Sequence, residues 1–173
     1  MKKVTIATTL LTCLLSSPFS RAADMTVNFT GNIIDSTCTI ATPDIQVPLG
    51  DHERRIFKTV GGTAPGRSFS VMLADCPTVI TSATFLFEGN ADSTDENYLA
   101  LTDEDGVATG IAIRIQQGSQ VIPINTETTV PSVANNGTPR SISANFFAYY
   151  VSTSTDVKPG KANATATITV IYQ

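Results

Sequence analysis

The chain has 173 residues, of which 42% are hydrophobic and 15% are charged, and its formal net charge is −4 at pH 7. An acidic chain with no basic cluster beyond Arg54-Arg55 is poorly suited to bind nucleic acid or an anionic membrane, so neither partner is expected. A single histidine excludes the multi-histidine metal sites that secreted β-sandwich enzymes such as copper–zinc superoxide dismutase require.

The first 22 residues are predicted to be an export signal that is removed. Two lysines precede an apolar run from Val4 to Leu15, which is too short to span a bilayer. The small residues Ser20 and Ala22 occupy the −3 and −1 positions for cleavage after Ala22. The mature chain keeps eight basic and fifteen acidic residues, a net charge of −7, and is long enough for one domain with its own core.

A β-strand is predicted at the start of the mature chain, from Met25 to Ile33, because apolar and polar residues alternate there. The same alternation recurs at the other end, from Ala162 to Tyr172. A terminal strand with one apolar face and an open edge is normally an aggregation hazard. Because both ends of the mature chain have this pattern, association is predicted to be the function.

The region between the two ends is predicted to consist of strands separated by turns. Turn-forming pairs such as Gly61-Gly62 and Asp105-Gly106 divide it, and no stretch keeps an apolar period of 3.6 residues for three helical turns. A β-sandwich is therefore expected instead of a parallel sheet with helices. The expected strands here are Val47–Gly50, Ser68–Leu73, Thr84–Phe87, Tyr98–Leu101, Gly110–Ile115, Val121–Ile124 and Ile142–Val151.

Two cysteines, Cys38 and Cys76, remain in the mature chain, and in an exported protein they are expected to form one disulfide. A redox-active pair would need a close spacing such as Cys-x-x-Cys. Closing a loop of about forty residues contributes roughly 4 kcal/mol on the chain-entropy model.

The chain is not expected to be an enzyme or to bind a cofactor, a metal or a small-molecule substrate. The lone His52 lies among charged residues and is expected to be solvated. The carboxylates of 92–96 and 103–105 could serve a calcium loop, but they lack the spaced ligands of an EF-hand and are expected to form solvated turns. A Gly-x-Ser-x-Gly nucleophile elbow and a phosphate-binding glycine loop are both missing from the sequence.

Several segments together resemble a known family, and they cover essentially the whole mature chain: 27–40, 47–50, 73–77, 87–92, 98–101, 145–150 and 159–173. They are similar to the pilin domain of chaperone–usher fimbrial subunits of the type 1 kind. The paired cysteines, the glycine fourteenth from the end (Gly160) and the penultimate Tyr172 make the resemblance specific.

The resemblance implies an all-β fold, an incomplete immunoglobulin-like β-sandwich that lacks its seventh strand. In that family a periplasmic chaperone lends a strand to the open groove. At the outer-membrane usher, the N-terminal extension of a neighbouring subunit replaces that strand, and donor-strand exchange builds the fibre. Such a contact uses main-chain bonds for affinity and alternate side chains for specificity.

The resemblance also assigns residues by position. The Cys38–Cys76 pair matches the family's disulfide. The donor-strand residues are Met25, Val27, Phe29, Gly31 and Ile33. The wall of the acceptor groove, which is also the strand that contacts the chaperone, comprises Gly160, Ala162, Ala164, Ala166, Ile168, Val170 and Tyr172.

The predicted organisation is a signal peptide (1–22), a donor-strand extension (23–34) and a pilin domain (35–173) that passes through the periplasm to a cell-surface fimbrium. The short stretch before Cys38 resembles that of minor or adaptor subunits more than that of rod pilins, and this role is preferred. Three alternatives stay open. The chain could be a major rod pilin, a single-domain adhesin that binds a host glycan through Glu88–Asn97, or a monomer whose extension fills its own groove.

Overall fold

The computed structural model describes residues 26–31, 37–80, 82–130, 133–135, 137 and 140–172. The chain divides into two compact units, Met1–Ile33 and Ile34–Gln173. The described part of the first unit, residues 26–31, is exposed and lies outside any assigned strand. The predicted signal peptide and its cleavage point lie outside the described residues.

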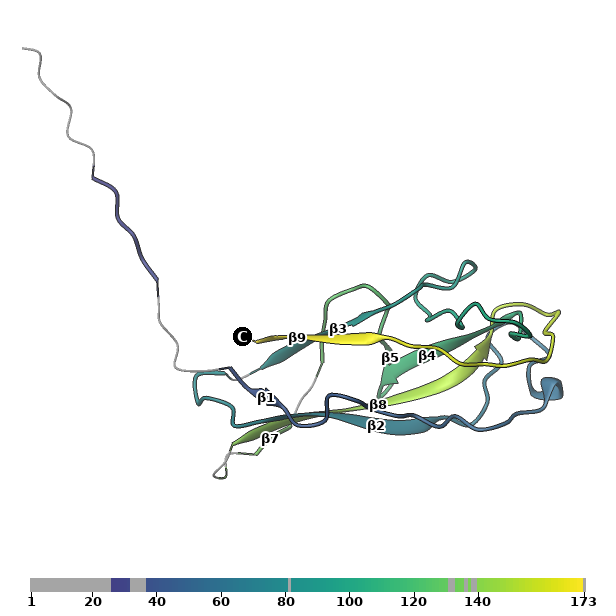
Figure 1. The fold of residues 1–173 in the computed structure, drawn as a ribbon, viewed down its shortest axis with the longest axis horizontal. Helices are drawn as coiled ribbons and strands as arrows, with labels where there is room; N and C mark the ends of the chain where they lie inside the picture. The colour runs from purple at the N-terminus through teal and green to yellow at the C-terminus, as the bar shows by residue number, and fades with distance from the viewer. Residues whose placement is uncertain are drawn as a thin grey trace, which may run out of the picture. The chain divides into compact units, whose positions relative to one another are not determined.

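The second unit is built from two β-sheets with antiparallel strand pairing (Figure 1). The larger sheet has the order β1 (Thr39–Ile40), β2 (Arg67–Ala74), β8 (Ser141–Ser152), β4 (Ile111–Gln117) and β5 (Gln120–Val121), with β7 (Val133–Asn135) also paired to β8. The smaller sheet has the order β6 (Thr128–Thr129), β3 (Ala83–Glu88) and β9 (Thr167–Tyr172).

Helical structure in the described ranges is limited to one 3-10 turn, η1 (Arg54–Ile56). Within those same ranges, no helix has the length and hydropathy needed to cross a membrane. The predicted all-β class is therefore confirmed for the part of the chain that the structure describes.

Alternation and runs of β-favouring residues in the sequence predicted the long strands correctly, while the shorter expected strands differ from the structure. The expected strand Ala162–Tyr172 is paired as a strand only from Thr167, because residues 162–166 lie next to the irregular 102–109 segment. The expected strand Val121–Ile124 ends at Val121, since Pro123 has no N–H to donate. Neither Val47–Gly50 nor Tyr98–Leu101 forms a strand, although Leu99 bridges to Ala91 and Ile113.

Phenylalanine rings fill the space between the two sheets. Phe146 of β8 is fully buried, and its ring centroid lies 5.4 Å from that of Phe85 and 5.1 Å from that of Phe87, both on β3. Phe69 of β2, the register partner of Phe146 on the adjacent strand, stacks on its ring with centroids 5.5 Å apart. The contacts join the sheets directly, so this aromatic group is the centre of the core.

The Cys38–Cys76 disulfide forms as the sequence predicts, with both residues buried. Cys38 immediately precedes β1, and Cys76 follows the end of β2, which is the strand that β1 pairs with. The bond therefore fastens a two-residue edge strand to its neighbour at a place where only a few main-chain bonds hold it.

A pair of adjacent residues on β8 tests this description of the core. Phe146→Ala is expected to lower the free energy of unfolding by about 3–5 kcal/mol, because it removes the ring that contacts both sheets. Phe147→Ala, on the opposite face and 46% exposed, should change it by less than about 1 kcal/mol. Urea unfolding of the two variants measures the difference, and equal losses would contradict the assigned faces of β8.

Candidate functional site: an open groove between the sheets

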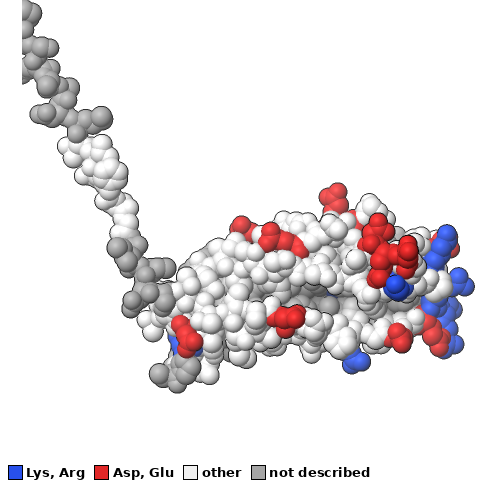
Figure 2. Space-filling view, in the orientation of Figure 1, with Lys and Arg blue, Asp and Glu red and all other residues white. Residues whose placement is uncertain are grey.

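The two sheets leave one side of the core uncovered. On that side β1 is the edge of the larger sheet and β9 is the edge of the smaller sheet. Between them, and between the chain segments that continue them, lies a groove with a volume of about 1160 Å³. Figure 2 shows a hollow on a face where uncharged residues predominate, with most Lys and Arg gathered at one end of the domain.

The floor of the groove consists of side chains that also form the core. β2, β3 and β4 contribute most of them, and the floor contains Phe69, Val71, Phe87, Leu99, Ile113 and Ile115. Phe69 is only partly buried although its ring contacts two core phenylalanines. The other floor side chains are buried, so an occupant of the groove would cover mainly the apolar surface of Phe69 and of the half-buried wall residues.

One wall of the groove is β9 together with the 158–166 segment before it. The predicted wall residues Gly160, Ala162, Ala164, Ala166, Ile168 and Val170 all line the groove. The apolar residues among them are half-buried, and the residues between them, Asn163, Thr165, Thr167 and Thr169, are exposed. The alternation read from the sequence therefore corresponds to the two faces of this wall.

Tyr172, the last residue of the predicted wall, does not line the groove. It packs against the core instead, and its hydroxyl donates a hydrogen bond to the carbonyl oxygen of Cys38 (3.4 Å). This contact joins the end of β9 to the start of β1. The end of β9 and the start of β1 thus meet at one end of the groove.

Gly160 is required where two backbones meet. A Cβ atom at this position would lie 2.4 Å from the carbonyl oxygen of Gly106 and 2.6 Å from the amide nitrogen of Ala108. The residue after it, Lys161, forms main-chain hydrogen bonds to both of those residues, each 2.8 Å long. Glycine therefore allows the 158–166 segment to pair with the 106–108 loop and hold its place beside the groove.

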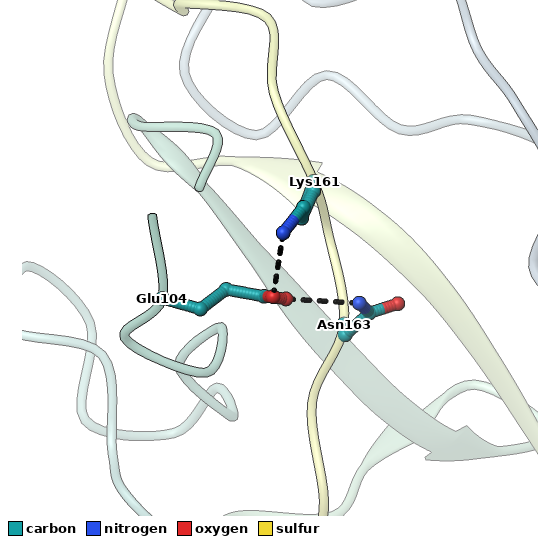
Figure 3. Close-up of polar contacts among 3 residues, drawn as sticks. All are labelled: Glu104, Lys161 and Asn163. Carbon is teal, nitrogen blue, oxygen red and sulfur yellow. Dashed lines mark hydrogen bonds and ion pairs between the residues drawn. The ribbon is translucent and has the colours of Figure 1, made fainter. Parts of the chain in front are cut away.

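A carboxylate holds the same segment from the side (Figure 3). Glu104 accepts hydrogen bonds from Lys161 Nζ (3.1 Å) and from Asn163 Nδ2 (2.9 Å). These bonds, that from Asn163 first and that from Lys161 second, lower the pKa of the Glu104 carboxyl below its ordinary value of 4.5. The sequence placed Glu104 in a solvated turn, because no local pattern connects it to residues 57 and 59 positions away.

Tyr150 supports the wall from β8. Its hydroxyl donates a hydrogen bond to the carbonyl oxygen of Ala162 (2.8 Å), and burial, with a smaller contribution from Asp51, raises the pKa of that hydroxyl. The ring also contacts His52 edge-on, with centroids 5.8 Å apart. His52 is half-buried rather than solvated as predicted, because the 48–52 segment folds against Tyr150.

The acidic cluster of residues 92–96 serves the backbone, as the turn interpretation expected. Asp92 Oδ1 accepts hydrogen bonds from the amides of Thr94 (3.0 Å) and Asp95 (3.2 Å). Among the described residues, no group of three or more His, Cys, Asp and Glu side chains is arranged to hold a metal ion.

The predicted donor residues belong to the other unit of the chain. Val27 and Phe29 are 60% and 93% exposed, and a Cβ atom added at Gly31 would meet nothing within 4 Å. The remaining two donor residues, Met25 and Ile33, lie outside the described residues. This segment therefore presents uncovered apolar side chains at alternate positions.

The geometry of the groove fits an extended peptide. The edge strands β1 and β9 border part of it, the irregular 41–52 and 158–166 segments border the rest, and its floor is apolar. Strand addition at such an edge combines main-chain hydrogen bonds with pockets for alternate side chains.

A family model for fimbrial proteins matches residues 27–173, a span that begins within the predicted extension and includes the groove. The chain belongs to the fimbrial protein family. It is 31% identical to long polar fimbria protein A of Salmonella typhimurium, an alignment that covers 100% of this chain and 98% of that protein. It is also 31% identical to a probable major fimbrial subunit of Escherichia coli O157:H7, again over 100% and 98% of the two chains.

Solved structures of pilins have the same fold. A type I fimbria protein of Burkholderia pseudomallei aligns with a TM-score of 0.60 at 31% identity, covering 84% of this chain and 96% of that one. The P pilus rod subunit PapA aligns with a TM-score of 0.62 at 17% identity, over 86% and 99% of the two chains. The predicted immunoglobulin-like β-sandwich is thereby confirmed.

These relatives establish the general role of the chain. It is a structural subunit of a fimbria, not an enzyme, and it works at the cell surface among neighbouring subunits. Within this fimbrial subunit, the open groove is the candidate site for those neighbours.

A substitution at Gly160 tests the backbone contact beside the groove. Gly160→Ala is expected to lower the free energy of unfolding by about 1–3 kcal/mol, because backbone atoms cannot yield to the added methyl group. Gly137→Ala is the matched control: its Cβ would meet only the Asn135 side chain, and a change within about 0.5 kcal/mol is expected. Chemical denaturation measures both, and an unchanged Gly160→Ala protein would contradict the close approach.

The Glu104 contacts predict a pH dependence of stability. Because the folded pKa is depressed, the stabilisation is present above pH 4.5 and is lost as the pH falls through the folded pKa. Glu104→Gln should therefore lower the melting temperature at neutral pH and flatten its fall in the acidic window. Melting curves from acidic to neutral pH provide the measurement, with Asp103→Asn as the control at the adjacent, exposed carboxylate. Parallel curves for Glu104→Gln and the unchanged protein would refute the assigned contact.

Proposed function

We propose that the chain is a minor or adaptor subunit that joins its neighbours by donor-strand exchange. Its groove receives a strand from another protein, and its own extension fills the groove of the next subunit. The observation that carries the proposal is the pairing of an open, apolar groove with an exposed segment of alternating apolar residues in the same chain.

The energetics support an exchange of this kind. Burying the four apolar donor side chains contributes about 1.5–3 kcal/mol each. Main-chain bonds along the two open edges add roughly 1 kcal/mol each. Together these terms are large enough to hold two subunits in a fibre without a covalent bond. Because the extension and the groove are different surfaces, the contact is heterologous and continues without closing.

Two further partners follow from the same groove. A subunit with an uncovered core would aggregate during export, so a periplasmic chaperone supplies a temporary strand along the 160–172 wall. An outer-membrane usher then accepts the subunit, where the extension of the incoming neighbour replaces the chaperone strand. This route leads through the periplasm to the cell surface.

The minor or adaptor role rests on the short extension. Fifteen residues, 23–37, precede Cys38 in the mature chain. This length suffices for one donor strand and leaves little chain for the contacts between turns of a rod.

A count of copies along single fimbriae, by immunogold labelling of this chain, decides the role. One or a few copies per fimbria supports it, and continuous labelling overturns it in favour of a rod subunit.

A pair of adjacent substitutions in the extension tests the exchange itself. Phe29→Arg is expected to abolish incorporation of the chain into fimbriae, because it places a charge on the face that enters an apolar groove. Asn28→Arg, on the opposite face, should leave incorporation nearly unchanged. Electron microscopy and immunoblots of fimbriae sheared from cells that express each variant provide the measurement. Equal incorporation of the two variants would contradict donor-strand exchange, and a soluble monomer with a protease-protected extension would indicate self-insertion.

A further inference from the structure

A second hollow lies on the outer face of the larger sheet, away from the groove. It has a volume of about 320 Å³ and is lined by Thr63, Ala64, Gly66, Arg114, Gln116, Phe147 and Tyr149. Arg114 of β4 and Tyr149 of β8 are register partners and point outward, since Ile113 and Ile115 point into the core. The hollow is shallow and open to solvent, and its volume is at the lower end of the range for small-molecule sites, about 300–1,000 Å³.

Arg114 is fixed in this hollow by its neighbours. Its guanidinium carbon lies 4.5 Å from the centroid of the Tyr149 ring, and its Nε donates a hydrogen bond to the Tyr149 hydroxyl (2.7 Å). That hydroxyl in turn donates to the side-chain carbonyl of Gln116, whose Nε2 donates to the carbonyl of Gly118 (2.9 Å). The chain of bonds holds the guanidinium in one orientation before any ligand arrives.

Gly66 allows the Tyr149 ring to lie flat on the sheet. A Cβ atom at this position would lie 2.9 Å from Tyr149 Cδ1 and 2.8 Å from the carbonyl oxygen of Ala148. Tyr149 is consequently buried although it is on the outer face. The base of the hollow is therefore a rigid layer of backbone and aromatic ring.

The positive charge of Arg114 has no carboxylate partner within 4.0 Å among the described residues. The ion pairs found there are Arg55 with Glu53 and Lys161 with Glu104. Arg114 differs from exposed basic residues such as Arg67 because its contacts with Tyr149 hold it in one orientation. Its planar fork matches the two oxygens of a carboxylate, which it can hold through two parallel hydrogen bonds.

An exposed aromatic ring borders the same charge. Phe147 is 46% exposed on the outer face of β8 and is the register partner of Gln116. A sugar ring has an apolar face that can cover an aromatic side chain and hydroxyl groups that can bind the Gln116 amide and the Thr63 hydroxyl. We propose that this hollow binds a saccharide that carries a carboxylate, with Arg114 holding the carboxylate and Phe147 contacting the sugar ring. This activity is independent of donor-strand exchange.

Saturation-transfer NMR on the mature chain, in the state in which it is purified from the periplasm, tests the proposal. The probe is glucuronate, and glucose is the neutral control. Binding of glucuronate alone is expected, with a dissociation constant on the order of 1 mM for a single sugar. Arg114→Gln should weaken it about 10-fold or more. Arg67→Gln, which removes an exposed arginine outside the hollow, should have no effect.

Two controls show whether a loss of binding is caused by unfolding, and whether the hollow prefers a sugar to another carboxylate. Circular dichroism spectra and melting curves establish that both arginine variants remain folded, and Phe147→Ala supplies a second loss-of-binding variant that retains the charge. No saturation transfer to glucuronate, or equal transfer to glucose, would overturn the proposal. Binding of N-acetylglutamate amide as tight as that of glucuronate would also overturn it, because the hollow would then receive an acidic side chain of a protein.

Discussion

The open groove between the β1 and β9 edges is the feature on which the proposed assembly depends. A β-sandwich gains its stability by burying the inner faces of both sheets, and here the edges of the two sheets stay apart on one side of the core. The side chains at the floor of the groove are the same ones that join the sheets, so they cannot be made polar without loss of the core. In the proposed donor-strand exchange an external strand fills this groove, and folding is thereby tied to assembly.

The walls of the groove are held by contacts that do not depend on a ligand. Gly160 permits main-chain bonds to the 106–108 loop, Glu104 holds Lys161 and Asn163, and Tyr150 bonds to Ala162. These contacts place the 158–166 segment beside the opening although it forms no regular strand. Contacts within the domain thus set the shape of the groove, which suits the proposed entry of a strand.

Alternation with a period of two allowed much of this structure to be predicted. It located β2 and assigned the two faces of the 162–170 segment, because burial on one face is a local property of the sequence, whereas runs of β-favouring residues located β3 and β4. Strands of two or three residues, such as β1 and β6, have too few positions to show a period. The contacts of Glu104 and His52 join residues far apart in the sequence, and only the fold brings them together.

The position of the disulfide has a mechanical consequence for the proposed fibre, in which the extension of each subunit holds the next. Tension along such a fibre enters the domain through the chain just ahead of Cys38, at a two-residue edge strand that a pull from one end could peel away. The covalent bond to Cys76 diverts that load past β1 to the end of β2, which is paired along its length with the long strand β8. Force on β2 then acts along many main-chain bonds at once. The main-chain hydrogen bonds between β2 and β8 are then loaded together in shear instead of breaking one at a time, so the subunit can bear load before its core opens.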